Sequence, residues 1–306
     1  MYLLDHTIQL KSRSDRVEIF SFFDCHIGKK NCYETGISKV IEEIKKHSKM
    51  SDRWVRVLLG GDQMNAINMS DTKRFDFGEL ADWFFDSDAE TIRERIGNLV
   101  EQEVKHAVGI FEPIQSLILG ALIGNHEKTM KTHQNVNVHS AFCERLRIID
   151  LTDEALLRFK FWIPCGKKRG LSSCVKLYLR HGYGAGRSAG AEPSKLTALL
   201  AEWEDADVCL SGHSHTFCII PPKPVLYVPN RGRLPKELFQ KYRYAANPGC
   251  WLKSHSSGAS TYESMACYPA RPMMTLKIVI WPFWNTKRMG EDIQRPKIEL
   301  REYPIL

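Results

Sequence analysis

Five short polar runs in this sequence each contain side chains that bind metal ions in proteins. They are Asp24-Cys25-His26, Gly61-Asp62, Gly124-Asn125-His126-Glu127, His181-Gly182 and Gly212-His213-Ser214-His215. Carboxylate, amide and imidazole ligands without a thiolate favour manganese, iron or zinc over a structural zinc site. The residue types and their grouping therefore predict a metal site that carries out catalysis.

Each polar run follows an apolar stretch that is rich in β-branched residues and typical of a buried strand. The predicted strands are Val17 to Phe23, Val55 to Leu59, Leu117 to Ile123, Cys174 to Leu179 and Val208 to Leu210. Apolar residues at helical spacing lie between them, at 37–44 and 196–203. This alternation predicts an α/β fold, in which ligands bind at the carboxyl edge of the sheet. In the first run, strand alternation places Asp24 and His26 on the same side.

The composition is that of a globular protein, with 43% hydrophobic and 26% charged residues. The chain can therefore bury a sizeable core without disulfides or structural metals. The nine cysteines are odd in number and never form a CxxC pair, which favours reduced thiols over a disulfide framework. No apolar run is long enough to cross a membrane, and residues 1–20 mix charged with apolar residues rather than forming a signal peptide. We expect a soluble, cytoplasmic protein without a membrane partner.

We predict a single domain over residues 1–306. Within it, residues 66–115 exceed the length of a simple crossover and are interpreted as a helical cap insertion beside the site. Residues 221–306 form a strand-rich C-terminal part, in which Met274 to Trp281 could complete a second sheet. This part has 14 Lys and Arg against six Asp and Glu, a net charge of +8 within a chain total of +7. Such a basic flank is typical of a protein that binds a polyanion, and a solvated basic surface is the alternative.

Taken in order, DxH, GDxxN, GNHE, a lone His before Gly, and GHSH resemble the signature set of the calcineurin-like metallophosphoesterases. The resemblance extends from Val17 to about Thr216, and Asn247-Pro248-Gly249 resembles a turn that follows the last motif in several members. It implies a four-layer α/β/β/α sandwich of two mixed sheets flanked by helices, with a helical insertion. It also implies hydrolysis of a phosphoester by a hydroxide that two metal ions activate.

The resemblance also implies a role for each residue of the motifs. The first metal would be bound by Asp24, His26 and His215. The second would be bound by Asn125, His181 and His213, with Asp62 bridging both ions. His126 would lie near the scissile phosphate without binding metal, where it could protonate the leaving oxygen. The two divalent ions are expected to be manganese, with iron, zinc and nickel as alternatives.

Three further residues are assigned to the surroundings of the metals. Glu127 is expected to orient a neighbouring ligand. Asn65 and Arg74 are candidates for contact with the substrate, since a guanidinium can bind a phosphate in bidentate fashion. For Arg74, a solvated loop residue is the alternative interpretation.

The substrate class is less well defined than the reaction. Phosphoprotein phosphatases of this superfamily carry Asp-Arg-Gly after the bridging aspartate, whereas residues 62–66 read Asp-Gln-Met-Asn-Ala, which counts against protein dephosphorylation. The basic C-terminal part favours a nuclease-like phosphodiesterase that acts on DNA or RNA. Its aromatic residues could stack on bases, or could instead fill the core; they are Trp251, Trp281, Phe283 and Trp284. The alternatives are a nucleotide or small-molecule phosphatase, and a catalytically silent phosphate-binding protein.

Overall fold

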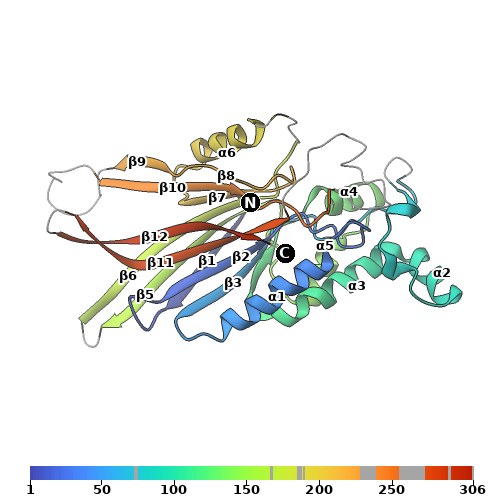
Figure 1. Ribbon diagram of the computed structural model, residues 1–306, viewed down its shortest axis with the longest axis horizontal. Coiled ribbons are helices and arrows are strands. Elements are labelled where there is room, and N and C mark those ends of the chain that lie inside the picture. The colour runs from blue at the N-terminus through green and yellow to red at the C-terminus, as the bar shows by residue number, and fades with distance from the viewer. Residues whose placement is uncertain are drawn as a thin grey trace.

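The structure, a computed structural model, contains two β-sheets and six α-helices among the residues that it describes. These are residues 1–71, 75–165, 168–184, 188, 190–227, 239–254, 273–288 and 291–304. The mixed α/β fold that the sequence predicts is confirmed (Figure 1).

A five-stranded sheet has the order β12-β11-β2-β3-β4. Its strands are β2 (Arg16–Phe22), β3 (Arg53–Leu59), β4 (Ile118–Ala121), β11 (Met274–Arg288) and β12 (Glu291–Pro304). Strands β2, β3 and β4 run parallel, so their carboxyl ends meet at one edge of the sheet. Strand β11 pairs antiparallel with β2, and it therefore extends the first sheet. The expectation that Met274 to Trp281 completes a second sheet is wrong, because β11 hydrogen-bonds to the open edge of β2.

The other sheet has seven strands in the order β1-β5-β6-β7-β10-β8, with β9 paired to β10. They are β1 (Tyr2–Gln9), β5 (Glu154–Cys165), β6 (Lys168–Arg180), β7 (Val208–Ser211), β8 (Cys218–Ile219), β9 (Lys223–Tyr227) and β10 (Phe239–Asn247). Strands β6, β7 and β10 run parallel. The C-terminal part of the chain thus contributes strands to both sheets.

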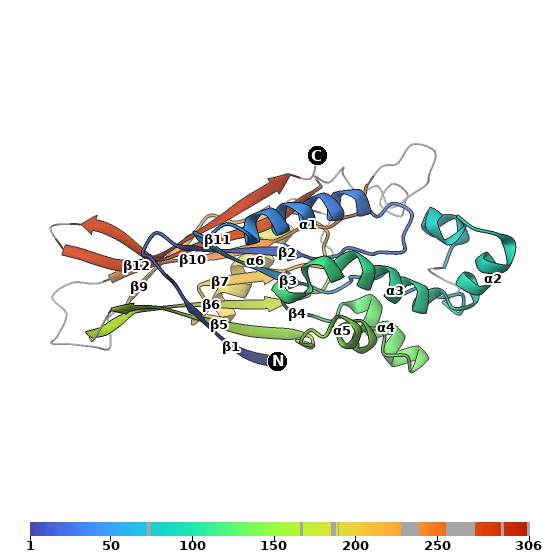
Figure 2. The same ribbon diagram turned by 90° about the horizontal axis from the view of Figure 1, so that it is seen from below.

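Helices lie on the outer face of each sheet, and both views show α1 and α3 on one side of the molecule and α6 on the other (Figures 1 and 2). The helices are α1 (Glu34–Ser48), α2 (Ala89–Gly97), α3 (Leu99–Phe111), α4 (Asn125–Gln134), α5 (Val138–Leu146) and α6 (Ala191–Glu202). Three short 3₁₀ helices are η1 (Phe77–Glu79), η2 (Asp82–Phe84) and η3 (Glu112–Leu117). No helix in the described part of the chain is long and apolar enough to cross a membrane.

Among the described residues, three large clusters of buried apolar side chains hold the sheets and helices together, and a small fourth one packs Leu80, Ala81 and Phe84 against Leu99. One lies between the sheets and includes Ile19 and Leu58 of the first sheet with Leu177 of the second. Another joins β2 and β3 to α1, α3 and α5, and a third joins β6, β7 and β10 to α6. Burial of this apolar area is the main contribution to stability. It also fixes the edge at which the parallel strands of both sheets end.

Residues 66–115 divide into two parts. Helix α3 packs on the first sheet through Val104, Ala107 and Phe111, which belong to the main core. Helix α2 has no buried residue, and it lies at the end of the molecule beyond α3 (Figure 1). Only the α2 part of the segment therefore projects beyond the first sheet, whereas α3 covers a face of that sheet.

No disulfide joins the seven cysteines whose side chains the structure describes. Most of them are buried, and burial raises the pKa of Cys25 and Cys32 well above the ordinary thiol value. Cys25 and Cys32 are therefore unreactive core thiols. The described cysteines are free, in agreement with the prediction of reduced thiols.

Candidate metal centre

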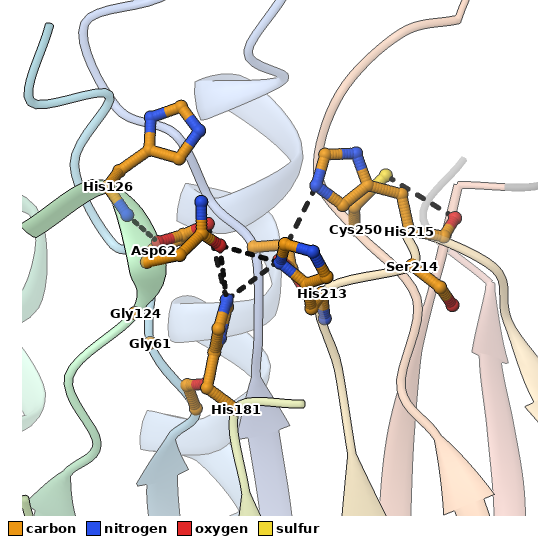
Figure 3. A network of polar contacts seen from close by, with 12 residues as sticks. Gly61, Asp62, Gly124, His126, His181, His213, Ser214, His215 and Cys250 are labelled. Carbon is orange, nitrogen blue, oxygen red and sulfur yellow. Dashed lines mark hydrogen bonds and ion pairs between the residues drawn. The ribbon is translucent and has the colours of Figure 1, made fainter. Parts of the chain in front are cut away.

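All seven residues that the motifs propose as metal ligands come together at the carboxyl ends of the parallel strands. Figure 3 labels four of them, which are Asp62, His181, His213 and His215. Asp24 and His26 follow β2, Asp62 follows β3, and Asn125 begins helix α4 after β4. His181 follows β6, and His213 and His215 follow β7. Because the two sheets end at the same place, loops far apart in sequence can share one site.

The local backbone of the ligands differs from the extended one that strand alternation predicts. Strand β2 ends at Phe22, so Asp24 and His26 lie in the loop beyond it. Five ligands have a left-handed backbone: Asp24 (φ 52°), His26 (φ 49°), Asp62 (φ 50°), His213 (φ 69°) and His215 (φ 55°). This conformation costs a non-glycine residue about 1–3 kcal/mol, and such strain is typical of functional sites. The folded loops, rather than a shared strand face, bring Asp24 and His26 together.

Backbone hydrogen bonds fasten the first two ligand loops to each other. The N–H of Asp24 donates to Gly61 O (3.1 Å), and the N–H of His26 donates to Asp62 O (2.9 Å). The N–H groups of Ile27 and Asn65 complete a short parallel bridge between the loops. The positions of Asp24, His26 and Asp62 are therefore coupled.

The first group of donor atoms consists of Asp24, His26 and His215. The Nε2 atoms of His26 and His215 are 3.1 Å apart, and His215 Nε2 is 3.5 Å from Asp24 Oδ1. Asp24 Oδ2 accepts the backbone N–H of His213 (2.9 Å), whereas the buried Oδ1 has no hydrogen-bond partner. Burial raises the energy of an unsatisfied carboxylate oxygen, so Asp24 Oδ1 is suited to bind a cation.

The second group lies around Asn125. Its Oδ1 atom is 2.6 Å from His213 Nδ1 and 3.0 Å from His181 Nε2. His181 Nδ1 lies 2.9 Å from the carbonyl oxygen of Gly60, which can only accept, so Nδ1 carries a proton. His181 Nε2 is consequently the nitrogen that can bind a metal ion.

Asp62 lies between the two groups. One oxygen, Oδ1, accepts the backbone N–H of His126 (2.9 Å), which fixes the carboxylate plane. The other, Oδ2, is 3.3 Å from His181 Nε2 and 3.9 Å from His26 Nε2. Asp62 Oδ2 therefore approaches one histidine of each group, as a bridging carboxylate would. Asp24 Oδ1 also lies near the second group, 3.9 Å from His181 Nε2.

The spacing of these donor atoms fits metal coordination. Two donors about 2.1 Å from one ion, at angles between 90° and 109°, lie about 3.0–3.4 Å apart. The separations of 3.0, 3.1, 3.3 and 3.5 Å are close to this range, whereas those of 2.6 Å and 3.9 Å lie outside it. The donors combine carboxylate, amide and imidazole groups, which suits divalent ions of the manganese, iron and zinc kind.

The electrostatics of the centre depend on the two most buried groups. Burial acts to raise the pKa of the Asp62 carboxyl, but the charges of His181 and His126 outweigh it and lower that pKa well below its ordinary value. Burial acts to lower the pKa of His181, yet the Asp62 charge raises that pKa to about 10. A metal ion would replace the His181 proton as the partner of Asp62.

Glu127 occupies the position from which it can hold the second and third motifs. Its Oε2 atom accepts the N–H groups of Asp62 (3.1 Å) and Gly124 (3.0 Å), and Oε1 accepts the N–H of Met64 (3.2 Å). Burial, together with the Asp62 charge, raises the pKa of Glu127 to about 8. Through these contacts Glu127 orients the backbone at Asp62, Met64 and Gly124, a role of the kind predicted for it from the sequence.

His126 contacts both neighbouring loops. Its Nδ1 atom lies 2.6 Å from the carbonyl oxygen of Asn65, and its ring packs edge-on against His26 with centroids 4.7 Å apart. One of its ring nitrogens lies within 4.8 Å of the donor atoms of His26 and Asp62. The structure therefore places His126 at the rim of the candidate metal centre, beside His26 and Asp62.

Of the two candidates for substrate contact, Asn65 and Arg74, the structure describes only Asn65. Asn65 is 5% exposed, and its buried Oδ1 atom has no hydrogen-bond partner. Arg74 lies outside the described residues, as do Thr72 and Lys73.

Two supporting glutamates, Glu192 and Glu103, are not predicted from the motifs, whereas Asn247 belongs to the turn that the resemblance includes. Asn247 Nδ2 donates to Glu192 Oε1 and to Ser214 Oγ, both at 2.8 Å, and so ties the last ligand loop to helix α6. Glu103 of α3 is fully buried and accepts the N–H of Ala66 (2.7 Å). Neither glutamate follows a predicted strand, so the rule that locates the ligands does not find them.

Comparison with known proteins gives matches at the level of structure. No family model and no curated protein matches the chain. Among 18 matching solved chains is a conserved uncharacterized protein from Streptococcus pneumoniae TIGR4, described as a predicted phosphoesterase. It is 12% identical, with 94% of this chain and 98% of that chain covered and a TM-score of 0.32. A metallophosphoesterase from Sphaerobacter thermophilus is 13% identical, with 94% and 89% covered and a TM-score of 0.29.

Proposed function

We propose that this protein is a metal-dependent phosphoesterase of the calcineurin-like type that binds two divalent ions. The observation that carries the proposal is the convergence of seven donor side chains from five loops, with the Asp62 carboxylate placed between two groups of ligands. The two sheets and their flanking helices support the finer architecture that the resemblance implies, an α/β/β/α sandwich with residues 66–115 as a helical insertion.

In this proposal Asp24, His26 and His215 hold one ion, Asn125, His181 and His213 hold the other, and Asp62 bridges them. Divalent ions at these positions supply Lewis acidity toward the phosphoryl oxygens and acidify the attacking water. Manganese is the proposed metal, with iron, zinc and nickel as alternatives.

The proposed role of His126 is to deliver a proton to the oxygen that leaves phosphorus. Its Nδ1 carries a proton, because the nearby carbonyl oxygen of Asn65 can only accept. Nε2 is therefore the nitrogen through which His126 would exchange a proton with the substrate. When His126 is protonated, its positive charge would also stabilise the charge that develops on the transferred group.

The proposed substrate is a phosphodiester in nucleic acid, and its main support is the net charge of +8 in residues 221–306. The aromatic residues give less support. Trp251 (1% exposed) and Phe283 (3% exposed) are core side chains, and Trp251 stacks on Phe22. Trp284 is 41% exposed, but it lies beyond the point where β11 pairs with Val17, at the end of β2 opposite the metal centre.

The proposal is tested with full-length protein loaded with manganese. Bis-nitrophenyl phosphate and nitrophenyl phosphate are compared as diester and monoester substrates, and bound metal is measured by elemental analysis. We expect about two equivalents of metal and hydrolysis of the diester. Release of acid-soluble nucleotides from single- or double-stranded DNA would then support the nucleic-acid substrate.

Other outcomes of the same experiment favour the alternatives. Preference for the monoester would indicate a nucleotide or small-molecule phosphatase. Bound metal without any turnover would indicate a phosphate-binding protein. His126→Ala should keep both metals and lose turnover by about 10²–10⁴-fold, and unchanged turnover would refute the role of His126.

A further inference from the structure

Helix α3 carries a carboxylic acid on the face that packs against the sheet. Glu103 is 0% exposed, and its neighbours on this face include Val104 and Ala107 of the main core. Burial of a carboxyl group is costly unless the group has a specific partner. In agreement, burial raises the pKa of Glu103 well above its ordinary value. A buried acid at a position where leucine would pack requires a reason.

The partner of Glu103 is the peptide group that joins Asn65 to Ala66. Glu103 Oε2 accepts the N–H of Ala66 at 2.7 Å. The carbonyl oxygen of the same peptide group, Asn65 O, accepts the proton of His126 Nδ1 at 2.6 Å. In a trans peptide the N–H and C=O bonds point in opposite directions. The glutamate and the histidine therefore lie at opposite edges of one peptide group.

The Asn65–Ala66 peptide group has a strained backbone conformation that its hydrogen bonds maintain. Ala66 has a left-handed φ of 47°, a conformation that alanine rarely adopts. The N–H of Asn65 donates to Ile27 O (2.9 Å), which ties the preceding peptide group to the first ligand loop. Without an acceptor for its N–H, the strained Asn65–Ala66 peptide would relax by rotation, and Asn65 O would turn away from His126.

Glu103 also contacts the first ligand loop at Gly28. A Cβ atom at Gly28 would overlap the Glu103 carboxyl group, and Gly28 has a φ of 104°, which suits glycine. The same side chain thus packs against Gly28 of the first ligand loop and also holds the Asn65–Ala66 peptide group.

We propose that Glu103 is a positioning residue for His126, which acts by fixing the Asn65–Ala66 peptide group whose carbonyl oxygen holds the His126 ring. The inference rests on the proposed function, in which His126 transfers a proton to the leaving oxygen. Glu103 itself touches neither metal ligands nor substrate in this scheme. Its effect should be confined to the proton-transfer step.

The test compares two diesters that differ in their leaving groups. Methyl nitrophenyl phosphate releases a weakly basic phenolate that needs no proton, whereas methyl phenyl phosphate releases a more basic one that does. Both are hydrolysed by manganese-loaded full-length protein, and kcat and KM are measured separately. Glu103→Leu removes the acceptor, Glu103→Asp withdraws it by one methylene, and Glu103→Gln retains an oxygen that can accept the N–H of Ala66.

We expect Glu103→Leu and Glu103→Asp to lower kcat for the phenyl ester at least about 10-fold more than kcat for the nitrophenyl ester. Glu103→Gln should retain most of the wild-type kcat for the phenyl ester. Combining Glu103→Leu with His126→Ala should add no further loss, because both changes disable the same proton transfer. Glu101→Gln is the matched control on the same helix, since Glu101 is exposed and pairs with Arg145 at the surface.

Three results would overturn the inference while leaving the proposed function intact. They are equal losses for both esters, a loss of bound manganese that explains the lower rates, and additive effects of the Glu103 and His126 substitutions. The Asp and Gln variants keep the test informative if Glu103→Leu does not fold. Absence of turnover of either ester by the metal-loaded wild type would instead overturn the proposed function.

Discussion

Replacement of Glu127 by glutamine should change the stability of the metal-free protein in a way that depends on pH. The Glu127 carboxyl accepts three backbone N–H groups, from Asp62, Met64 and Gly124, at 3.0–3.2 Å. Glutamine offers one acceptor oxygen, which can serve Asp62 and Gly124, and its amide nitrogen would face the N–H of Met64. One buried N–H group is then unsatisfied, which costs about 1–3 kcal/mol.

The wild-type side chain has a cost of its own at higher pH. Burial raises the pKa of Glu127 from 4.5 to about 8, so between these values the folded protein holds a proton that the unfolded protein has lost. The free energy of unfolding therefore falls as pH rises through this range, by about 1.4 kcal/mol per pH unit at full effect. Glutamine does not titrate and avoids this loss. Glu127→Gln should be less stable than wild type near pH 5 and more stable near pH 8.

The measurement is urea unfolding of both proteins in the presence of a chelator, at several values between pH 5 and pH 8. Glu101→Gln serves as the control for the substitution itself, because this glutamate lies at the surface, where it pairs with Arg145. A constant difference between wild type and Glu127→Gln would refute the reasoning, since it would mean that folding does not bind a proton at Glu127.

Three further predictions follow from the geometry of the centre. Asp62→Asn should lower bound manganese from about two equivalents to one or fewer and abolish diester cleavage, as measured by elemental analysis and a nitrophenolate assay; two retained ions would contradict the bridging role. Metal binding should release about one proton from His181, whose pKa is raised to about 10, so calorimetric enthalpies at pH 7.5 should differ between buffers in proportion to their ionisation enthalpies; no dependence on buffer would contradict it. Gly28→Ala should lower the free energy of unfolding by about 1–3 kcal/mol, because alanine is strained at a φ of 104° and its Cβ would overlap Glu103; chemical denaturation at wild-type stability would show that the loop adapts.

Much of the centre could be predicted because its ligands obey a simple rule of position. Buried parallel strands are marked by continuous apolar runs, and the loops that follow them must meet at one edge of the sheet. Asp62, His181 and His213 each stand shortly after such a run, so sequence alone places them in one neighbourhood. The α/β class follows from the same alternation of strands and helices.

Other sequence patterns are too weak or too ambiguous to predict a position in the fold. The sequence analysis predicts no strand at β1 or β5, and it allows Met274 to Trp281 to complete a second sheet, whereas β11 pairs with β2 of the first. Strand-forming patterns do not specify partners, because the choice of edge depends on contacts between residues far apart in the chain. For the same reason Trp251 could be read as a base-stacking residue, although it packs on Phe22 in the core.

The sequence by itself determined the types of the proposed metal-binding side chains and the strands that precede them, since both depend on local runs of residues. Only the tertiary structure decided how the loops bend and what holds them. The left-handed backbone of Asp24 and His26 is maintained by hydrogen bonds to the second loop, which local sequence does not encode. The contact of Glu103 with the Asn65–Ala66 peptide joins a helix to a loop 37 residues earlier, and it arises only when α3 packs on the sheet.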